Sequence, residues 1–284
     1  MNTASPPKFQ RKRTANLKVY LYAIRDTIKT ATITYDSSQL KQTNIFFVFA
    51  LGRSGTQFLS RTLNQHPSTR VLHEPTKRDT IEYARSFSKD YNFNKYANGY
   101  RKKYLQNHLH KHPVDHYGEV NSILRRHAAA LLKAIPNSKG LYMIRDGRDV
   151  VRSMMSRALF TDEWFHQTIH PSENDPYLED WQQWGAFEKC CWLWASENVL
   201  LKHALGKAFR LEQLLNDYDY FKDHILSPTG LDISQPVWES QREVKSMNHT
   251  RAYTAPHYSE WSKEWQTTFW DICGEVMQEN GYEP

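Results

Sequence analysis

The sequence predicts a three-layer α/β fold, in which a central, mostly parallel sheet is flanked by helices. Strand-like apolar segments alternate with helix-like amphipathic segments along most of the 284 residues. The segment 45–50 is a continuous apolar run, which is typical of a central strand with both faces covered. We therefore expect a single domain over residues 18–284, preceded by a mobile, basic segment over residues 1–17.

The predicted elements follow one another in a regular order. After the strand at 45–50, residues 56–65 have apolar side chains on one helical face. Residues 76–112 are polar, basic and rich in tyrosine, with a mainly helical pattern. Further strands are expected at 71–72, 117–120, 140–144 and 208–211, and further helices at 123–135, 150–159, 185–205 and 261–281.

The composition limits the classes of function. The chain has a formal net charge of +6 and contains nine Trp and sixteen Tyr, which suits a globular enzyme rather than a disordered chain. The positive charge is either an ordinary solvated surface or a means of attracting an anionic ligand. A nucleic-acid partner is not expected, because no recognition motif accompanies the charge.

The three cysteines, Cys190, Cys191 and Cys273, show neither a disulfide pattern nor a metal-ligand spacing. We expect free thiols buried in helices and no metal ion. The apolar stretch at 19–24 is too short for a signal-peptide core or a membrane span. The sequence thus favours a cytoplasmic protein without a membrane partner.

The first motif follows the strand at 45–50 and reads Leu-Gly-Arg-Ser-Gly-Thr over residues 51–56. Backbone N–H groups, the Arg53 guanidinium and two hydroxyls would converge there on a helix N-terminus, an arrangement that binds phosphate. Only two residues separate the glycines and no lysine follows, so the motif is not a Walker A loop. The alternative is an ordinary strand–helix turn with an exposed arginine.

The second motif, Arg-Asp-Gly-Arg-Asp at residues 145–149, follows the strand at 140–144. Arg145 stands at the strand end and Ser153 lies two helical turns further on, so the pair can grip one phosphate from two sides. The alternative is a set of surface ion pairs worth less than about 1 kcal/mol. Together, the two motifs can hold both ends of a doubly phosphorylated ligand.

These motifs resemble those of the sulfotransferases that use 3′-phosphoadenosine 5′-phosphosulfate (PAPS). Residues 47–59 look like the family's 5′-phosphosulfate loop, and residues 143–153 look like its 3′-phosphate motif. Residues 209–215 are similar to its late strand with an acidic residue, and the closing residues 280–284 also fit. The resemblance spans residues 44–284 and is strongest to the tyrosylprotein and carbohydrate branches.

The resemblance implies a P-loop-like sulfotransferase fold and an in-line transfer of a sulfuryl group from PAPS, which leaves as adenosine 3′,5′-bisphosphate (PAP). The acceptor would be a hydroxyl or amine on a small molecule, a carbohydrate or a peptide. Arg53 would stabilise the leaving oxygen, while Arg145 and Ser153 would hold the 3′-phosphate. The 5′-phosphate would be bound by the first loop: Gly52, Arg53, Ser54, Gly55, Thr56 and Gln57.

The resemblance also suggests a base and one departure. Glu74 follows the strand at 71–72, where the tyrosylprotein branch has an acidic residue, and His73 is the rival base. That branch has a lysine near the third strand, which this sequence lacks, so Arg53 acts alone or Asn121 or a distant lysine assists. Arg251 lies where the family often has a loop that closes over the donor, and it could reach a phosphate there.

Two other functions are compatible with the sequence. One is a kinase-like P-loop phosphoryl-transfer enzyme, and the other is a nucleotide-binding protein without catalysis. The segment 160–184 mixes aromatic and acidic residues, which suits either a pocket for a cationic acceptor or a surface loop that packs on the core. We favour the packed loop. The acceptor and the oligomeric state do not follow from the sequence.

Overall fold

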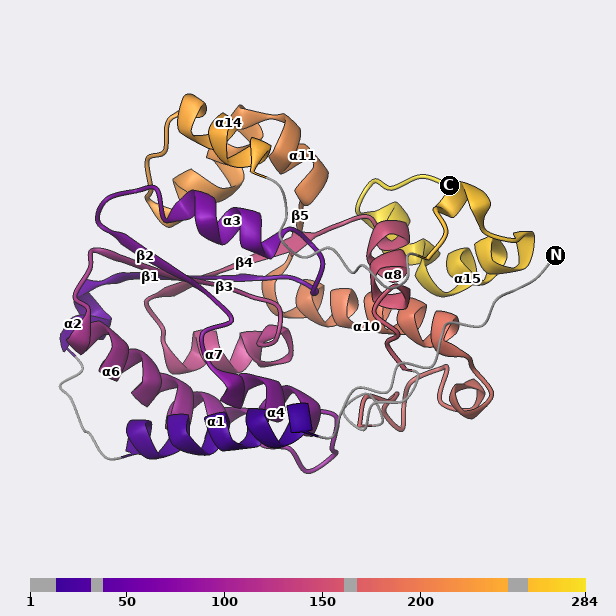
Figure 1. Cartoon of the computed structure of the whole chain (residues 1–284), viewed down its shortest axis with the longest axis horizontal. Coiled ribbons are helices and arrows are strands. Elements are labelled where there is room, and N and C mark those ends of the chain that lie inside the picture. The colour runs from indigo at the N-terminus through magenta and orange to yellow at the C-terminus, as the bar shows by residue number, and fades with distance from the viewer. Residues whose placement is uncertain (1–13, 32–37, 161–167, 245–254) are drawn as a thin grey trace.

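A computed structural model describes residues 14–31, 38–160, 168–244 and 255–284. Within these residues five strands form one parallel sheet, in the order β2-β3-β1-β4-β5 (Figure 1). Helices cover both faces, which confirms the predicted three-layer α/β fold. The strands are β1 (Asn44–Phe49), β2 (Thr69–His73), β3 (His116–Asn121), β4 (Ser138–Ile144) and β5 (Phe209–Arg210).

The central position of β1 in the sheet explains why its sequence shows no alternation of apolar and polar residues. Ile45 and Phe47 pack into the core on one face of the sheet, whereas Phe46 and Val48 pack into the core on the other. All four side chains are at most 1% exposed. Because β1 pairs with β3 on one side and β4 on the other, it has no solvent-facing edge or face.

The helices form one group on each face of the sheet (Figure 1). The Phe46 face is covered by α3 (Thr56–Leu63), α11 (Leu211–Asn216), α12 (Tyr218–Phe221), α13 (Ser227–Thr229) and α14 (Gln235–Glu243). On the Phe47 face lie α2 (Ser38–Gln42), α4 (Lys77–Arg85), α5 (Phe93–Tyr96), α6 (Lys102–Lys111), α7 (Ala128–Ala134) and α10 (Ala186–Leu205), with α1 (Thr14–Ala31) packed outside them on α4. Two further helices, α8 (Gly147–Met155) and α15 (Lys263–Glu279), pack against α10.

The helix expected at 150–159 ends earlier than predicted. Helix α8 ends at Met155, and Ala158 has a left-handed φ of 54°. The N–H of Leu159 donates to the carbonyl of Met154 and the N–H of Ala158 to that of Met155, which is a Schellman closure. Glycine usually occupies this left-handed position. Because an alanine stands there, the sequence lacks the usual signal for the end of a helix.

Five charged side chains are buried at and next to β3. We call this group the buried ionic layer, and it consists of Asp79, Arg101, Glu119, Arg125 and Glu197. Arg101 donates to Glu119 at 2.6 Å and lies 3.4 Å from Asp79, and all three side chains are at most 1% exposed. Arg125 donates to Glu197 at 2.5 Å. Burial raises the pKa of Asp79 to about 7, against the opposing effect of Arg101. Each buried cation thus has a carboxylate partner.

The structure shows the state of the three cysteines and the character of the described helices. Cys190, Cys191 and Cys273 are buried free thiols within α10 and α15, as predicted. Among the described helices, none combines the length and the apolar character that a bilayer span requires.

Candidate active site

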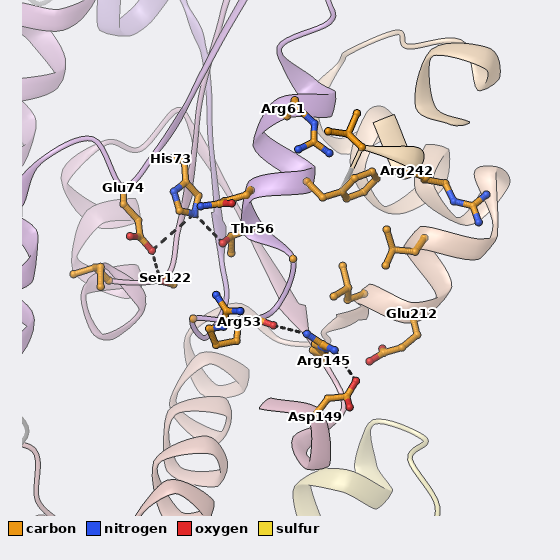
Figure 2. Close-up of a pocket in the computed structure, with 18 of the residues that line it drawn as sticks. Arg53, Thr56, Arg61, His73, Glu74, Ser122, Arg145, Asp149, Glu212 and Arg242 are labelled. Carbon is orange, nitrogen blue, oxygen red and sulfur yellow. Dashed lines mark hydrogen bonds and ion pairs between the residues drawn. The ribbon is translucent and has the colours of Figure 1, made fainter. Parts of the chain in front are cut away.

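A cavity of about 730 Å³ opens where the strands end. Its lining includes a residue that follows the carboxyl end of each strand: Arg53 after β1, Glu74 after β2, Ser122 after β3, Arg145 after β4 and Glu212 after β5. In Figure 2, Arg53 lies between Glu74 on one side and Arg145 on the other. The parallel topology therefore gathers charged residues from distant parts of the chain at one edge of the sheet.

The first loop is built on two left-handed residues. Gly55 has a φ of 73°, and a Cβ there would come within 2.6 Å of the Leu211 side chain, so this position requires glycine. Arg53 also has a positive φ of 78°, a conformation that costs a non-glycine residue about 1–3 kcal/mol. Helix α3 begins at Thr56 without a side-chain cap, and Thr56 and Gln57 line the cavity. Its first N–H groups therefore carry the partial positive charge of a helix N-terminus.

The two arginine motifs are in direct contact. Arg53 Nε donates to Ser153 Oγ at 2.7 Å, and Arg145 Nη1 donates to the carbonyl oxygen of Arg53 at 2.8 Å. Arg145 Nη2 also donates to Asp149 at 2.6 Å (Figure 2). The contact arises because β1 and β4 are neighbours in the sheet.

Positive charge is concentrated around Arg53. Burial lowers the pKa of Arg53, and the cations of Arg157 and Arg145 lower it further. An anion bound there would relieve this repulsion. Arg157 lines the cavity, although no motif singled it out. Its position four residues after Ser153 is the signal that could have found it.

Glu74 stands in a cluster of polar side chains opposite Arg145. Its carboxylate accepts a short hydrogen bond from Ser122 Oγ and lies 3.9 Å from His73 Nε2. The same His73 nitrogen is 2.8 Å from Thr56 Oγ1. Glu74 has a left-handed φ of 46°, so both predicted catalytic residues, Glu74 and Arg53, have strained backbones. Such strain is often found at functional sites.

The other predicted binding residues differ in how they meet the cavity. Gly52 lines it, whereas Ser54 is only 1% exposed and lies within the loop. Ser153 contacts Arg53 and is not itself part of the cavity wall. Arg251 lies outside the described residues.

Comparisons with known proteins show the family to which the chain belongs. A family model described as "Sulfotransferase family" matches residues 46–198, a range that contains both arginine motifs. The chain belongs to the sulfotransferase family. This membership supports sulfotransfer and does not favour the kinase-like alternative. A comparison with curated protein sequences found no match.

Several solved structures resemble this sulfotransferase. Sulfotransferase STF9 from Mycobacterium avium has 14% sequence identity and a TM-score of 0.51, over 95% of this chain and 83% of that chain. The sulfotransferase domain from the curacin biosynthetic pathway has 12% identity and a TM-score of 0.48, over 85% and 98%. Mouse sulfotransferase SULT7A1, complexed with PAP, has 12% identity and a TM-score of 0.43, over 91% and 90%. The first similarity shows a shared fold.

Asn121, which we considered as a group that assists the leaving oxygen, does not line the cavity. Its Oδ1 accepts the N–H groups of Ile123 and Leu124, its Nδ2 donates to Glu119, and it is 0% exposed. Among the described residues that line the cavity there is no lysine. The cations that line it are arginines: Arg53, Arg61, Arg145, Arg157 and Arg242.

The aromatic and acidic segment packs on the core of the sulfotransferase where the structure describes it. Trp181 is 8% exposed and meets Trp192 edge to face, with ring centroids 4.9 Å apart. Asp175 accepts a hydrogen bond from the Trp192 indole. No described residue between 168 and 184 lines the cavity, which favours the packed loop over an acceptor pocket there.

Metal-ligating residue types are not clustered in the described segments. No group of three or more His, Cys, Asp or Glu side chains in them could hold a metal ion. The polar side chains among the described residues that line the cavity are arginines, hydroxyls, an amide, a histidine and carboxylates.

Proposed function

We propose that this sulfotransferase transfers a sulfuryl group from PAPS to a hydroxyl or amine of its acceptor. The observation that carries the proposal is the convergence of Arg53, Arg145 and Glu74 on one cavity at the strand ends. The two arginines supply the charge that a doubly phosphorylated donor needs, and the carboxylate supplies a base.

The cavity residues fit such a donor. The uncapped start of α3 and the Arg53 guanidinium would hold the 5′-phosphate. Arg145 and Ser153 would hold the 3′-phosphate, with Arg157 as a third cation within reach. The hydrogen bond between Arg53 and Ser153 is compatible with these roles, because it uses one of the five N–H groups of the Arg53 guanidinium and leaves the Ser153 hydroxyl its own hydrogen to donate.

Each catalytic residue has a defined task in the transfer. Glu74 accepts the acceptor's proton while the acceptor oxygen or nitrogen forms its bond to sulfur. The bond from sulfur to the 5′-phosphate oxygen breaks, and its electron pair stays on that oxygen. Arg53 stabilises the negative charge that develops there. PAP then leaves, and Glu74 returns its proton to solvent.

The surroundings of Glu74 support its role over that of His73. Ser122 holds the Glu74 carboxylate by a hydrogen bond, which fixes its direction at the cavity wall. The Nε2 atom of His73 already contacts Thr56 Oγ1 at 2.8 Å. His73 would therefore have to give up this contact before it could act as the base.

A substitution that keeps the shape of Glu74 tests the proposal. Glu74→Gln should lower sulfuryl transfer from PAPS by about 10²–10⁴-fold, because the amide cannot take up a proton. Transfer is measured by mass spectrometry over a panel of hydroxylated compounds and amines, and PAP binding by calorimetry. PAP affinity should change little.

The controls separate the possible outcomes. His73→Gln, which alters the neighbouring side chain, should keep most of the transfer rate if Glu74 is the base. An unchanged rate in Glu74→Gln would exclude Glu74, and a loss confined to His73→Gln would assign the base to His73. If the wild-type protein bound PAP without transfer to any compound of the panel, the non-catalytic alternative would be favoured.

A further inference from the structure

The C-terminal helix ends in a turn that sends the chain back toward the cavity. Gly281 has a φ of 72°, and its N–H donates to the carbonyl of Gln278. The N–H of Tyr282 donates to the carbonyl of Met277 at 2.9 Å, which completes a Schellman closure of α15. The turn places Tyr282 in the interior, where it is 3% exposed.

Tyr282 is linked to the second arginine motif through one carboxylate. Its hydroxyl donates to Glu212 Oε2 at 2.8 Å. The other oxygen, Glu212 Oε1, accepts the backbone N–H of Asp146 at 2.9 Å. Asp146 directly follows Arg145, and its side chain caps α8 by accepting the N–H of Arg148. Two hydrogen bonds therefore connect the C-terminal turn to Asp146, the second residue of the motif at 145–149, which we call the Arg145 turn.

A second set of contacts holds the C-terminal turn in place. The Arg210 guanidinium stacks on the Tyr282 ring, 4.1 Å from its centroid, and donates to the carbonyl of Gly281 at 3.0 Å. Arg148 donates to the carbonyl of Glu283 at 3.0 Å. The last residues are therefore attached both to β5 and to the start of α8.

Glu212 places a negatively charged side chain at the cavity. Glu212 lines the cavity, where a carboxylate repels phosphate and so opposes the binding of an anionic donor. Both of its oxygens, however, accept hydrogen bonds from protein groups. Burial and the adjacent Glu212 raise the pKa of Tyr282, so its hydroxyl keeps the proton that it donates.

We propose that Tyr282 and Glu212 are positioning residues that hold the Arg145 turn in its donor-binding arrangement. They act through the N–H of Asp146, which fixes the backbone from which the Arg145 side chain extends. The inference rests on the proposed function, since it takes Arg145 as the 3′-phosphate ligand. Its consequence is that the C-terminal turn contributes to discrimination between PAP and 5′-AMP.

Removal of a single hydroxyl tests this link. Tyr282→Phe keeps the ring and its contact with Arg210 but leaves Glu212 with one donor fewer. We expect it to lower the ratio of PAP to 5′-AMP affinity by about three- to tenfold, the effect of one lost hydrogen bond on a positioned group. Calorimetry with both nucleotides measures the ratio.

Tyr142→Phe is the matched control. Tyr142 is also 3% exposed, and its hydroxyl donates to Asn198 at 2.9 Å, away from the cavity wall. This variant loses a comparable buried hydrogen bond and should leave the ratio unchanged. If both variants lowered the ratio equally, general destabilisation rather than positioning would be the cause.

Two substitutions of Glu212 complete the experiment. Glu212→Gln removes the negative charge but keeps an acceptor for the Asp146 N–H and can donate to the Tyr282 oxygen, so we expect a ratio no lower than that of the wild type. Glu212→Ala removes the same charge and both links, so its ratio should lie below that of Glu212→Gln by at least the factor lost in Tyr282→Phe. Equal ratios in Glu212→Ala and Glu212→Gln would overturn the inference.

Arg145→Ala, measured alongside, distinguishes failure of the inference from failure of the proposed function. If Arg145→Ala lowers the ratio and Tyr282→Phe does not, the positioning role is wrong and the donor site stands. If neither variant changes the ratio, the assignment of Arg145 to the 3′-phosphate fails, and the positioning role fails with it.

Discussion

The cavity and the buried ionic layer are both rich in arginine, but the arginine side chains differ in their exposure to solvent and in their partners. In the buried layer Arg101 is 1% exposed and lies between Glu119 and Asp79. At the cavity Arg145 is 30% exposed, and it shares its donors between Asp149 and the carbonyl of Arg53. Arg53 in turn donates to a neutral hydroxyl, that of Ser153.

The difference follows from the surroundings. An unpaired charge in a dry interior costs several kcal/mol, so buried arginines persist only with carboxylate partners. A half-exposed arginine is partly solvated and can remain available to a ligand. The cavity arginines therefore suit anion binding, whereas the buried ones stabilise the fold around β3.

The largest effect expected from this comparison is on stability. Arg101→Ala leaves Asp79 and Glu119 without their cation in the interior, which should lower the free energy of unfolding by about 3–5 kcal/mol. Urea unfolding followed by circular dichroism measures the change. A loss below about 1 kcal/mol would show that the buried layer does not depend on this pairing.

The next effect is on catalysis. Arg53→Ala should lower the rate of sulfuryl transfer by about 10²–10³-fold, since it removes a contact to the developing charge. The free energy of unfolding should change by less than about 1 kcal/mol. Arg85→Ala, at a surface arginine with a 63% exposed side chain, is the control and should leave the rate unchanged. A large loss of stability in Arg53→Ala would erase the distinction between the two regions.

The smallest effect is on ligand discrimination. Arg145→Ala should weaken PAP binding by about ten- to a hundredfold, the worth of a hydrogen bond to a charged group. Binding of 5′-AMP, which has no 3′-phosphate, should weaken far less. Calorimetric titration with both nucleotides measures the two affinities. Equal losses would place Arg145 elsewhere than at the 3′-phosphate.

The sequence predicted the strands and the two arginine motifs because these signals are local. A continuous apolar run marked β1, and glycines marked the turn in which Arg53 lies. The end of α8 was missed because Ala158 occupies a position where glycine is the usual signal. Arg157 was missed because it lies beyond the second motif, in the turn that closes α8, and only its spacing of four residues from Ser153 relates it to that motif.

By itself, the sequence determined the alternation of strands and helices and the loops that carry Arg53, Glu74 and Arg145. These follow from side-chain periodicity and turn chemistry over a few neighbouring residues. Only the tertiary structure decided that Arg53 meets Ser153 and that Tyr282 reaches the Arg145 turn through Glu212. Such contacts depend on the order of the strands in the sheet and on how the last helix ends, because these bring together residues that are far apart along the chain.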